Sequence, residues 1–315
     1  MEYLTQFFLP VSILFQSAPD WLVSIMKGFT FLGDTEFYLL TMPLLYWCID
    51  LALGIRIGVM LLLSGGLNSI FKFGFSSPRP FCISGRVEPL VEATGFGFPS
   101  GHAQNAAGIW GLLSATTKKS WLKVISISLI IIIGLSRIIL GVHFAHDVLA
   151  GWLFGLIILF IFVKLEDKVL NWFKKSSVGL QILALTIITS LFIIIPRLIV
   201  NPLDPHTYQT SVFCDFNPYD FEGLMTTSGA FFGLGIGIIL LYQTGWFKVD
   251  GPIWKRILRY LVGLIGVLAL YLGLKYIFPD DISVLAYVLR FVRYFLIGVW
   301  ISFGAPKFFE WIKLA

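Results

Sequence analysis

The chain has 315 residues, of which 57% are hydrophobic and 13% are charged, and its mean hydropathy is +0.86. Soluble domains carry about 25% charged residues, so this composition excludes a soluble globular protein and predicts an integral membrane protein. The net charge of +5 comes from Lys and Arg residues that are scattered over short loops, which excludes a basic surface for nucleic acid.

Two short apolar segments, residues 3–15 and 21–32, open the chain. Each is shorter than the roughly 20 residues that a perpendicular membrane span needs. We interpret them as interfacial or re-entrant helices, with one short tilted span as the alternative, and treat residues 1–33 as a separate N-terminal part. Asp34 and Thr35 then have the character of a helix N-cap.

Apolar runs of helical length predict the rest of an all-α polytopic membrane protein. Five spans over residues 37–49, 51–71, 102–115, 124–140 and 144–163 are expected in a core bundle, residues 34–175. Within the core, a polar loop covers residues 73–101 and a charged linker covers residues 164–175. Four more runs, at residues 180–200, 225–242, 257–277 and 284–303, predict a C-terminal transmembrane extension, residues 176–315. Helices are expected because spans of this length satisfy their own backbone groups and no alternating barrel pattern is present.

The predicted loops carry opposite charges on the two sides of the membrane. One side holds the basic groups Lys118/Lys119/Lys123, Lys164/Lys168/Lys174/Lys175, Lys248/Lys255/Arg256/Arg259 and Lys307/Lys313. The other side holds Asp204, Asp215, Asp220, Glu222, Asp280 and Asp281. Basic loops face the cytoplasm, so we expect a plasma (inner) membrane protein whose 73–101 loop and 136–147 turn both face the extracytoplasmic side.

Three groups of polar residues converge on that outer side. They are Lys72 with Arg79-Pro80, the turn Pro99-Ser100-Gly101-His102 that opens a helix, and Ser136-Arg137 with His143 and Asp147. The helix start offers free N–H groups and a dipole that favours an anion. The three cations of these groups repel one another unless a group of charge about −2, such as phosphate, lies between them.

The histidines of these groups then have predictable roles. Asp147 follows His143 by one helical turn, which places its carboxylate within reach of one ring nitrogen and leaves the other nitrogen free as a nucleophile. His102, on a different helix, is placed to protonate the leaving oxygen. No carboxylate cluster on this side resembles a Mg²⁺ or two-metal site, so we predict phosphoryl transfer through a phosphohistidine without metal or cofactor.

Taken in order, the three groups resemble the signatures of a known family, the type 2 phosphatidate phosphatase superfamily of lipid phosphate phosphatases. The matching residues are Lys72-x6-Arg79-Pro80, Pro99 to His102, and Ser136-Arg137-x5-His143-x3-Asp147. The resemblance covers about residues 34–165 and implies that family's six-helix-type core bundle, to which this chain adds about four further transmembrane helices.

The resemblance also implies roles for individual residues. His143 would be the nucleophile, Asp147 its orienting partner and His102 the general acid. The phosphate-binding residues would be Lys72, Arg79, Ser100, the Gly101 amide, Arg137 and Ser136. His146 lies outside the motif, and we interpret it as a surface histidine, with a supporting role behind the site as the alternative.

Several features lie outside the resemblance. Arg290 and Arg293 share one face of a predicted span and either pair with acidic residues such as Asp220 or Glu222, or line a polar cavity. The C-terminal extension either packs beside the core or at an oligomer interface, or else it shapes lipid entry and headgroup selectivity. Cys82 and Cys214 both fall in outer loops, which leaves their pairing open, and His206 is expected to be a loop residue.

The sequence therefore predicts a membrane phosphatase that removes phosphate from a lipid monophosphate or diphosphate. The expected partners are this lipid substrate and membrane lipids, whereas the oligomeric state and the identity of the lipid are not predicted. Transfer of the phosphoryl group to an acceptor hydroxyl is an alternative with the same site. A lipid transporter or binding protein is the alternative from another class, although it would need none of the three motifs.

Overall fold

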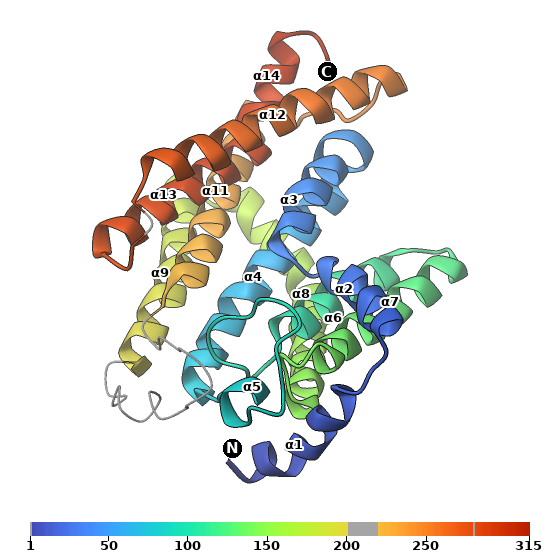
Figure 1. Ribbon diagram of the computed structural model, residues 1–315. Helices are drawn as coiled ribbons and strands as arrows, with labels where there is room; N and C mark the ends of the chain where they lie inside the picture. The colour runs from blue at the N-terminus through green and yellow to red at the C-terminus, as the bar shows by residue number, and fades with distance from the viewer. Residues whose placement is uncertain (1, 201–219, 280) are drawn as a thin grey trace. The chain divides into compact units, whose positions relative to one another are not determined.

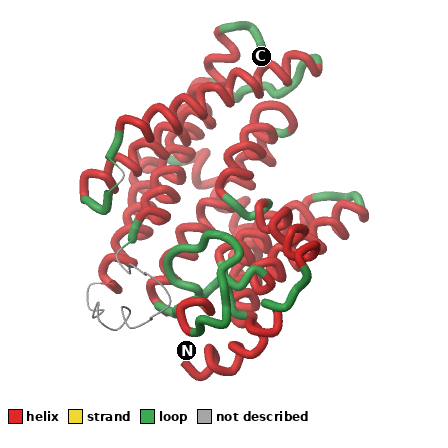
Figure 2. Tube along the Cα trace, in the orientation of Figure 1, coloured by secondary structure: helices red, strands yellow, loops and turns green. Residues whose placement is uncertain are grey.

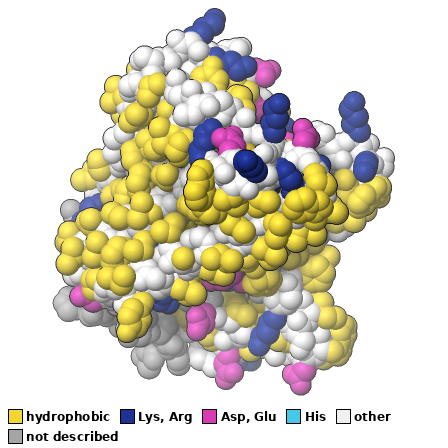
Figure 3. Space-filling model, turned by 90° about the horizontal axis from the view of Figure 1, so that it is seen from above, with side chains coloured by type: hydrophobic (Ala, Val, Ile, Leu, Met, Phe, Trp, Pro, Cys, Tyr) yellow, Lys and Arg dark blue, Asp and Glu magenta, His cyan; other side chains and the backbone are white. Residues whose placement is uncertain are grey.

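The computed structural model describes residues 2–200, 220–279 and 281–315, and these residues are helical apart from loops and turns, with no strand among them (Figure 2). Within these ranges, seven helices are long and apolar enough to cross a membrane. Hydrophobic side chains cover much of the face shown in Figure 3. The prediction of an all-α polytopic membrane protein is therefore confirmed.

The chain forms two compact units that are interleaved along the sequence. The first is built mainly from Met1–Phe37 and Leu67–Leu165, and the second mainly from Tyr38–Gly66, Glu166–Ile194 and Phe221–Ala315. Because the units are interleaved, they do not test the predicted boundaries at residues 33 and 175, which stay a prediction.

The first unit contains the helices that carry the three motifs (Figure 1). Its helices are α1 (Glu2–Phe15), α2 (Asp20–Phe31), the end of α4 (Leu51–Phe75), α5 (Pro80–Ile83), α6 (Gly101–Thr116), α7 (Ser120–Ile139) and most of α8 (Ala145–Lys175). The two N-terminal helices bend by 118° at their junction, as in a broken span or a re-entrant loop, and α2 packs against α7. The longest loop of the described chain, residues 84–100, connects α5 to α6.

Glycines allow α6 and α8 to pack in close contact. A Cβ atom on Gly151 would lie 2.6 Å from the Ser100 carbonyl oxygen, and a Cβ atom on Gly155 would overlap the Gln104 carbonyl oxygen. The four-residue spacing places both glycines on one face of α8. The start of α6, with the Pro-Ser-Gly-His turn, is thereby held against the first two turns of α8, where Asp147 lies.

The second unit contains the helices of the C-terminal extension. Its elements are α3 (Thr35–Leu44), the π-helical turn η1 (Leu45–Ile49), the first part of α4, α9 (Val178–Val200), α11 (Glu222–Thr244), α12 (Ile253–Ile277), α13 (Val284–Val299), the π-helical turn η2 (Trp300–Gly304) and α14 (Ala305–Trp311). Its core centres on Tyr46 and Trp47, whose side chains donate hydrogen bonds to the carbonyl oxygens of Ser302 and Ile301, at 2.9 and 2.8 Å.

A stripe of glycines joins α11 to α13. Cβ atoms on Gly229 and Gly233 would overlap the carbonyl oxygens of Phe291 and Phe295. In turn, a Cβ atom on Gly298 would lie 2.7 Å from the Leu234 amide nitrogen. The two backbones therefore pack directly on each other, as small residues permit in membrane helices.

The structure differs from the predicted elements at several places. The predicted linker 164–175 is wrong, because these residues continue α8 to Lys175. The predicted spans at residues 37–49 and 102–115 correspond to α3 (10 residues) with η1 (5 residues) and to α6 (16 residues). Both are shorter than the roughly 20 residues of a perpendicular span. Asp204, His206, Cys214, Asp215 and Asp280 lie outside the described residues, and so does the pairing of Cys214 with Cys82.

The two arginines of α13 have different surroundings. Arg290 donates from Nη2 to Glu222 Oε2 at 2.7 Å, which confirms the predicted pairing with an acidic residue. Arg293 is buried, with its guanidinium carbon 5.7 Å from the ring centre of Tyr271 and 5.2 Å from that of Tyr294. Cation–π contacts of this kind stabilise a desolvated guanidinium.

The glycine contact between α11 and α13 predicts a specific loss of stability. We expect Gly233→Ala to destabilise the protein by about 2 kcal/mol or more, because its methyl group has no room beside the Phe295 carbonyl. Gly223→Ala is the matched control, since it lies in the same helix and its Cβ would meet nothing within 4 Å. Thermal unfolding in detergent measures both, and equal melting temperatures of the two variants would contradict the packing.

Candidate active site

The motif residues of the first unit come together where α4 and α7 end and where α6 and α8 begin. Lys72 lies near the end of α4, Arg79 immediately before α5, Ser100 at the N-cap of α6, and Arg137 in the last turn of α7. His143 lies in the short turn between α7 and α8. Arg79 Nη1 lies 3.2 Å from His143 Nε2, and the Ser100 amide donates to the Asp147 carbonyl at 2.9 Å, so the structure brings residues of the three predicted groups together.

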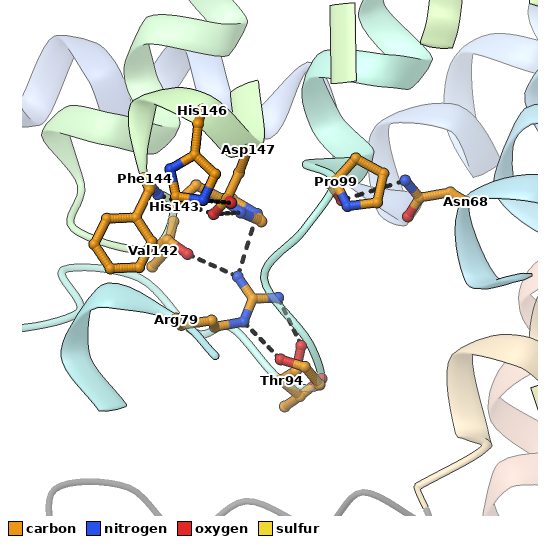
Figure 4. A network of polar contacts seen from close by, with 10 residues as sticks. Asn68, Arg79, Thr94, Pro99, Val142, His143, Phe144, His146 and Asp147 are labelled. Atoms are coloured by element: carbon orange, nitrogen blue, oxygen red, sulfur yellow. Dashed lines mark hydrogen bonds and ion pairs between the residues drawn. The ribbon is translucent and has the colours of Figure 1, made fainter. Parts of the chain in front are cut away.

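Arg79 is buried and almost all of its donors are used (Figure 4). Nε donates to the Gly95 carbonyl at 2.8 Å, and Nη2 donates to the Thr94 carbonyl at 2.7 Å. Nη1 donates to the Val142 carbonyl at 2.8 Å and lies 3.2 Å from His143 Nε2. The loop before α6 thus wraps the guanidinium and fixes one of its N–H groups on the histidine.

His143 is held at both ring nitrogens. Its Nδ1 lies 3.2 Å from Asp147 Oδ2, and its Nε2 faces Arg79 Nη1. An ionised carboxylate only accepts hydrogen bonds and a guanidinium only donates them. The ring proton is therefore assigned to Nδ1 and the lone pair to Nε2, which leaves Nε2 as the nucleophilic atom.

The surroundings of His143 also keep its ring neutral. The side chain is 2% exposed, and this burial, followed by the nearby charges of Arg79 and Arg137, holds the pKa of His143 well below its ordinary value. Burial and like charges both disfavour the imidazolium form. The lone pair on Nε2 is consequently available at neutral pH.

Asp147 is fully buried and ties the turn to two helices. Its Oδ2 accepts a hydrogen bond from the Phe144 amide at 2.9 Å as well as facing His143, and its backbone carbonyl accepts one from the Ser100 amide at 2.9 Å. The carboxylate therefore has a fixed position relative to α6. Gly97 approaches it as well, since a Cβ there would lie 3.3 Å from Asp147 Oδ2.

The start of α6 presents an unsatisfied donor. The Ser100 hydroxyl is fully buried and has no hydrogen-bond partner. Behind it, Asn68 Nδ2 donates to the Pro99 carbonyl at 3.3 Å and to Gln104 Oε1 at 2.9 Å. Asn68 thus orients the turn, and a buried hydroxyl without a partner is costly unless a ligand supplies the acceptor.

The remaining predicted phosphate-binding residues differ in how far they are engaged. Arg137 is buried and donates from Nη1 to the Thr30 hydroxyl, while its Nε is buried without a partner. Lys72 is half-buried near both arginines. The buried Ser136 hydroxyl donates to the Ile133 carbonyl at 2.7 Å, so its proton is already used within α7.

His102 lies in the first turn of α6. Its Nε2 lies 2.8 Å from Asp34 Oδ1. Sequence reasoning missed Asp34, because a carboxylate just before an apolar run has the same signature as a helix N-cap. It also missed Thr30 and Asn68, for which a polar side chain inside an apolar segment was the only signal.

His146 corrects the sequence interpretation, because it is buried and is not a surface histidine. Its ring stacks on those of Phe98 and Phe144, with ring centres 5.9 and 5.3 Å apart. Its Nε2 lies 3.2 Å from Asp147 Oδ1, yet this contact lacks hydrogen-bond geometry and both ring nitrogens are left without a partner. We therefore treat it as a close electrostatic contact behind the site.

In the described parts of the chain, no group of three or more His, Cys, Asp or Glu side chains is arranged to hold a metal ion.

Comparison with known proteins identifies both parts of the chain. Residues 53–170 match the PAP2 superfamily, and residues 225–315 match the transmembrane extension of PAP2 superfamily phosphatases. The chain is 30% identical to phosphatidylglycerophosphatase B of Bacillus subtilis over 174 residues, which cover 49% of this chain and 80% of that protein. It is 28% identical to human glucose-6-phosphatase 3 over 322 residues, which cover 89% of this chain and 88% of that protein.

Two further similarities cover about half of the chain. Sphingosine-1-phosphate phosphatase 1 of Mus musculus is 29% identical over 170 residues, 52% of this chain and 40% of that protein. The crystal structure of a transmembrane PAP2 type phosphatidylglycerolphosphate phosphatase from Bacillus subtilis matches 53% of this chain and 87% of that chain, with 25% identity and a TM-score of 0.45. The chain belongs to the PAP2 superfamily, as its motifs predicted, and is a membrane-bound phosphoric ester hydrolase with that superfamily's transmembrane extension.

Proposed function

We propose that this phosphatase hydrolyses lipid phosphates through a phosphohistidine on His143, at a site that faces the extracytoplasmic side. The observation that carries the proposal is the position of the His143 ring. Its Nδ1 is held by Asp147 and its Nε2 lies beside a guanidinium donor of Arg79, so the nucleophilic lone pair is directed to the place where a bound phosphate would meet the cations.

The chemistry follows from these groups in two steps. His143 Nε2 attacks phosphorus, the bond to the leaving oxygen breaks, and His102 gives that oxygen a proton. Water then attacks the phosphohistidine, His102 takes a proton from it, and the bond between Nε2 and phosphorus breaks. Asp147 stabilises the ring while it carries positive charge.

The predicted phosphate-binding residues would stabilise the charge that develops on the phosphoryl oxygens. Phosphate oxygens are acceptors for the buried Ser100 hydroxyl, the Gly101 amide and the side chains of Lys72, Arg79 and Arg137. On binding, one oxygen replaces His143 Nε2 as the acceptor for Arg79 Nη1, which frees the lone pair for attack. Ser136 is the weakest member of the set, since its hydroxyl donates to Ile133.

A lipid substrate is supported by the membrane setting and by relatives whose names specify lipid phosphates. The apolar helices place the site at helix ends, where a lipid headgroup lies while its chains stay in the bilayer. A sugar phosphate is the second candidate. The similarity to glucose-6-phosphatase 3 covers 89% of this chain and so includes much of the C-terminal part, whereas the similarity to phosphatidylglycerophosphatase B covers only 49%.

A substrate panel tests the reaction and the substrate class together. We expect purified protein to release phosphate from phosphatidate, phosphatidylglycerophosphate, sphingosine 1-phosphate or a polyprenyl diphosphate, with a kcat/KM at least about tenfold above that for glucose 6-phosphate, or about 1.4 kcal/mol in transition-state binding. We expect EDTA to leave these rates unchanged. A preference for glucose 6-phosphate would favour the second candidate, and strong inhibition by EDTA would contradict the metal-free mechanism.

The phosphohistidine makes a stereochemical prediction. Two successive in-line displacements retain the configuration at a chiral phosphorus, whereas direct attack by water inverts it. We expect retention, together with acid-labile, alkali-stable phosphate on the wild-type protein after rapid quenching and none on His143→Ala. Inversion would exclude the intermediate even if His143→Ala were inactive. Added glycerol measures the phosphotransferase alternative, which predicts that glycerol phosphate outweighs free phosphate.

The sidedness of the site can be tested with two single cysteines. Arg86 is exposed in the loop before α6, on the site side of the first unit, and Lys119 is exposed in the turn between α6 and α7 at the other end of α6. With the native cysteines replaced, we expect a membrane-impermeant maleimide to label Arg86→Cys in intact cells and Lys119→Cys only after permeabilisation. The reverse pattern would place the site in the cytoplasm.

A further inference from the structure

The N-terminal helices contribute directly to the site, although the PAP2 superfamily match begins only at residue 53. Thr30 in the last turn of α2, and Gly33 and Asp34 just after this helix, contact predicted catalytic or phosphate-binding residues. Thr30 accepts a hydrogen bond from Arg137, Gly33 packs on the His102 ring, and Asp34 pairs with His102 Nε2. These contacts are independent of the motifs and have no role in the mechanism above.

Gly33 and Asp34 together fix the position of the His102 ring. A Cβ on Gly33 would lie 2.5 Å from His102 Cδ2 and 3.3 Å from Nε2, so the ring occupies the space that any side chain at this position would need. The next residue places its carboxylate Oδ1 2.8 Å from Nε2. Since the carboxylate is an acceptor, Nε2 carries a proton and the ring is fixed with Nδ1 as its second functional nitrogen.

We propose that Asp34 is the positioning residue for the leaving-group acid, so that the site contains two carboxylate–histidine pairs, Asp147–His143 for attack and Asp34–His102 for proton transfer. The proposal rests on the proposed function, since it assigns the proton that the first step needs. The two pairs differ in exposure: Asp147 is fully buried, whereas the Asp34 side chain is 36% exposed. Burial and the charge of Arg137 lower the pKa of His102, and the Asp34 carboxylate opposes them by favouring the imidazolium form that an acid requires.

The Asp34–His102 pair would supply the proton that the first step consumes and take back a proton in the second step. In the first step the Nε2–P bond of His143 forms, the P–O bond to the leaving group breaks, and its electron pair takes the proton from His102 Nδ1. In the second step the water oxygen bonds to phosphorus, the N–P bond breaks, and a water proton returns to Nδ1. Asp34 stays ionised throughout and accepts the Nε2–H hydrogen bond in both states of the ring.

The test uses two substrates that differ in how much they need an acid. The leaving group of an alkyl phosphate such as dioctanoyl phosphatidate is a basic alkoxide, whereas the leaving group of 4-nitrophenyl phosphate is a stable anion. The ratio kcat/KM reports steps up to cleavage of the P–O bond, so it isolates the first proton transfer. We expect Asp34→Asn in the full-length protein to lower kcat/KM about 100-fold for the alkyl phosphate and about threefold or less for the aryl phosphate.

Matched variants separate positioning from general damage. Glu36→Gln removes an exposed carboxylate two residues away and should leave both substrates unchanged. Gly33→Ala displaces the His102 ring and should reproduce the selective loss on the alkyl phosphate. Gly28→Ala is its control, because Gly28 lies in the preceding helix α2 and a Cβ there meets nothing within 4 Å. This pair keeps the proposal testable if Asp34→Asn does not fold.

A double variant gives the decisive result. If Asp34 acts through His102, Asp34→Asn should cause no further loss in a His102→Ala protein, since the two act as a unit. Equal losses on both substrates, unchanged rates, or additive losses in the double variant would overturn the proposal. The proposed function fails separately, if His143→Ala retains wild-type hydrolysis.

Discussion

The His143 imidazole, held between a carboxylate and a guanidinium, is the interaction on which the site depends. Asp147 fixes the ring proton on Nδ1, and Arg79 faces the lone pair on Nε2. Both Asp147 and Arg79 are in turn held by further hydrogen bonds. Asp147 is held by the Phe144 amide, and Arg79 by the carbonyls of Thr94, Gly95 and Val142. If His143 is the nucleophile, as we propose, its fixed position means that little reorganisation is needed when substrate binds.

The close approach of α6 and α8 connects this interaction to the rest of the first unit. Gly151 lets the Ser100 carbonyl approach α8, and the Ser100 amide in turn donates to the Asp147 carbonyl at 2.9 Å. The Pro-Ser-Gly-His turn and the residue that carries the Asp147 carboxylate are thus joined by one backbone hydrogen bond. A displacement of α6 relative to α8 would separate Ser100 from His143 and Asp147, so in the proposed mechanism the packing of these two helices is a functional constraint as well as a structural one.

The sequence predicted those features that depend on local pattern. Apolar runs located the helices, and the motif spacing located Arg79, His143 and Asp147, which the structure brings together. Features that depend on tertiary contact were missed. Asp34 has the local signature of an N-cap, and its partner His102 lies on a helix far along the chain. His146 was misassigned because the aromatic residues that bury it come partly from α1, through Phe8. The linker at residues 164–175 was misread because charge is compatible with a helix that continues beyond the membrane.

The arginines of the two units differ in the groups that accept their hydrogen bonds. Arg56 and Arg290 in the second unit pair with Glu166 and Glu222, at 2.8 and 2.7 Å, and their charge is neutralised within the protein. Among the described residues, Arg79 and Arg137 form no ion pair with a carboxylate, and neutral carbonyls and a hydroxyl accept their hydrogen bonds. Burying a cation without a counter-charge is costly. Arg293 is also buried, and the rings of Tyr271 and Tyr294 contact its guanidinium. At Arg79 and Arg137, the dianionic phosphate of the proposed substrate would supply the missing counter-charge.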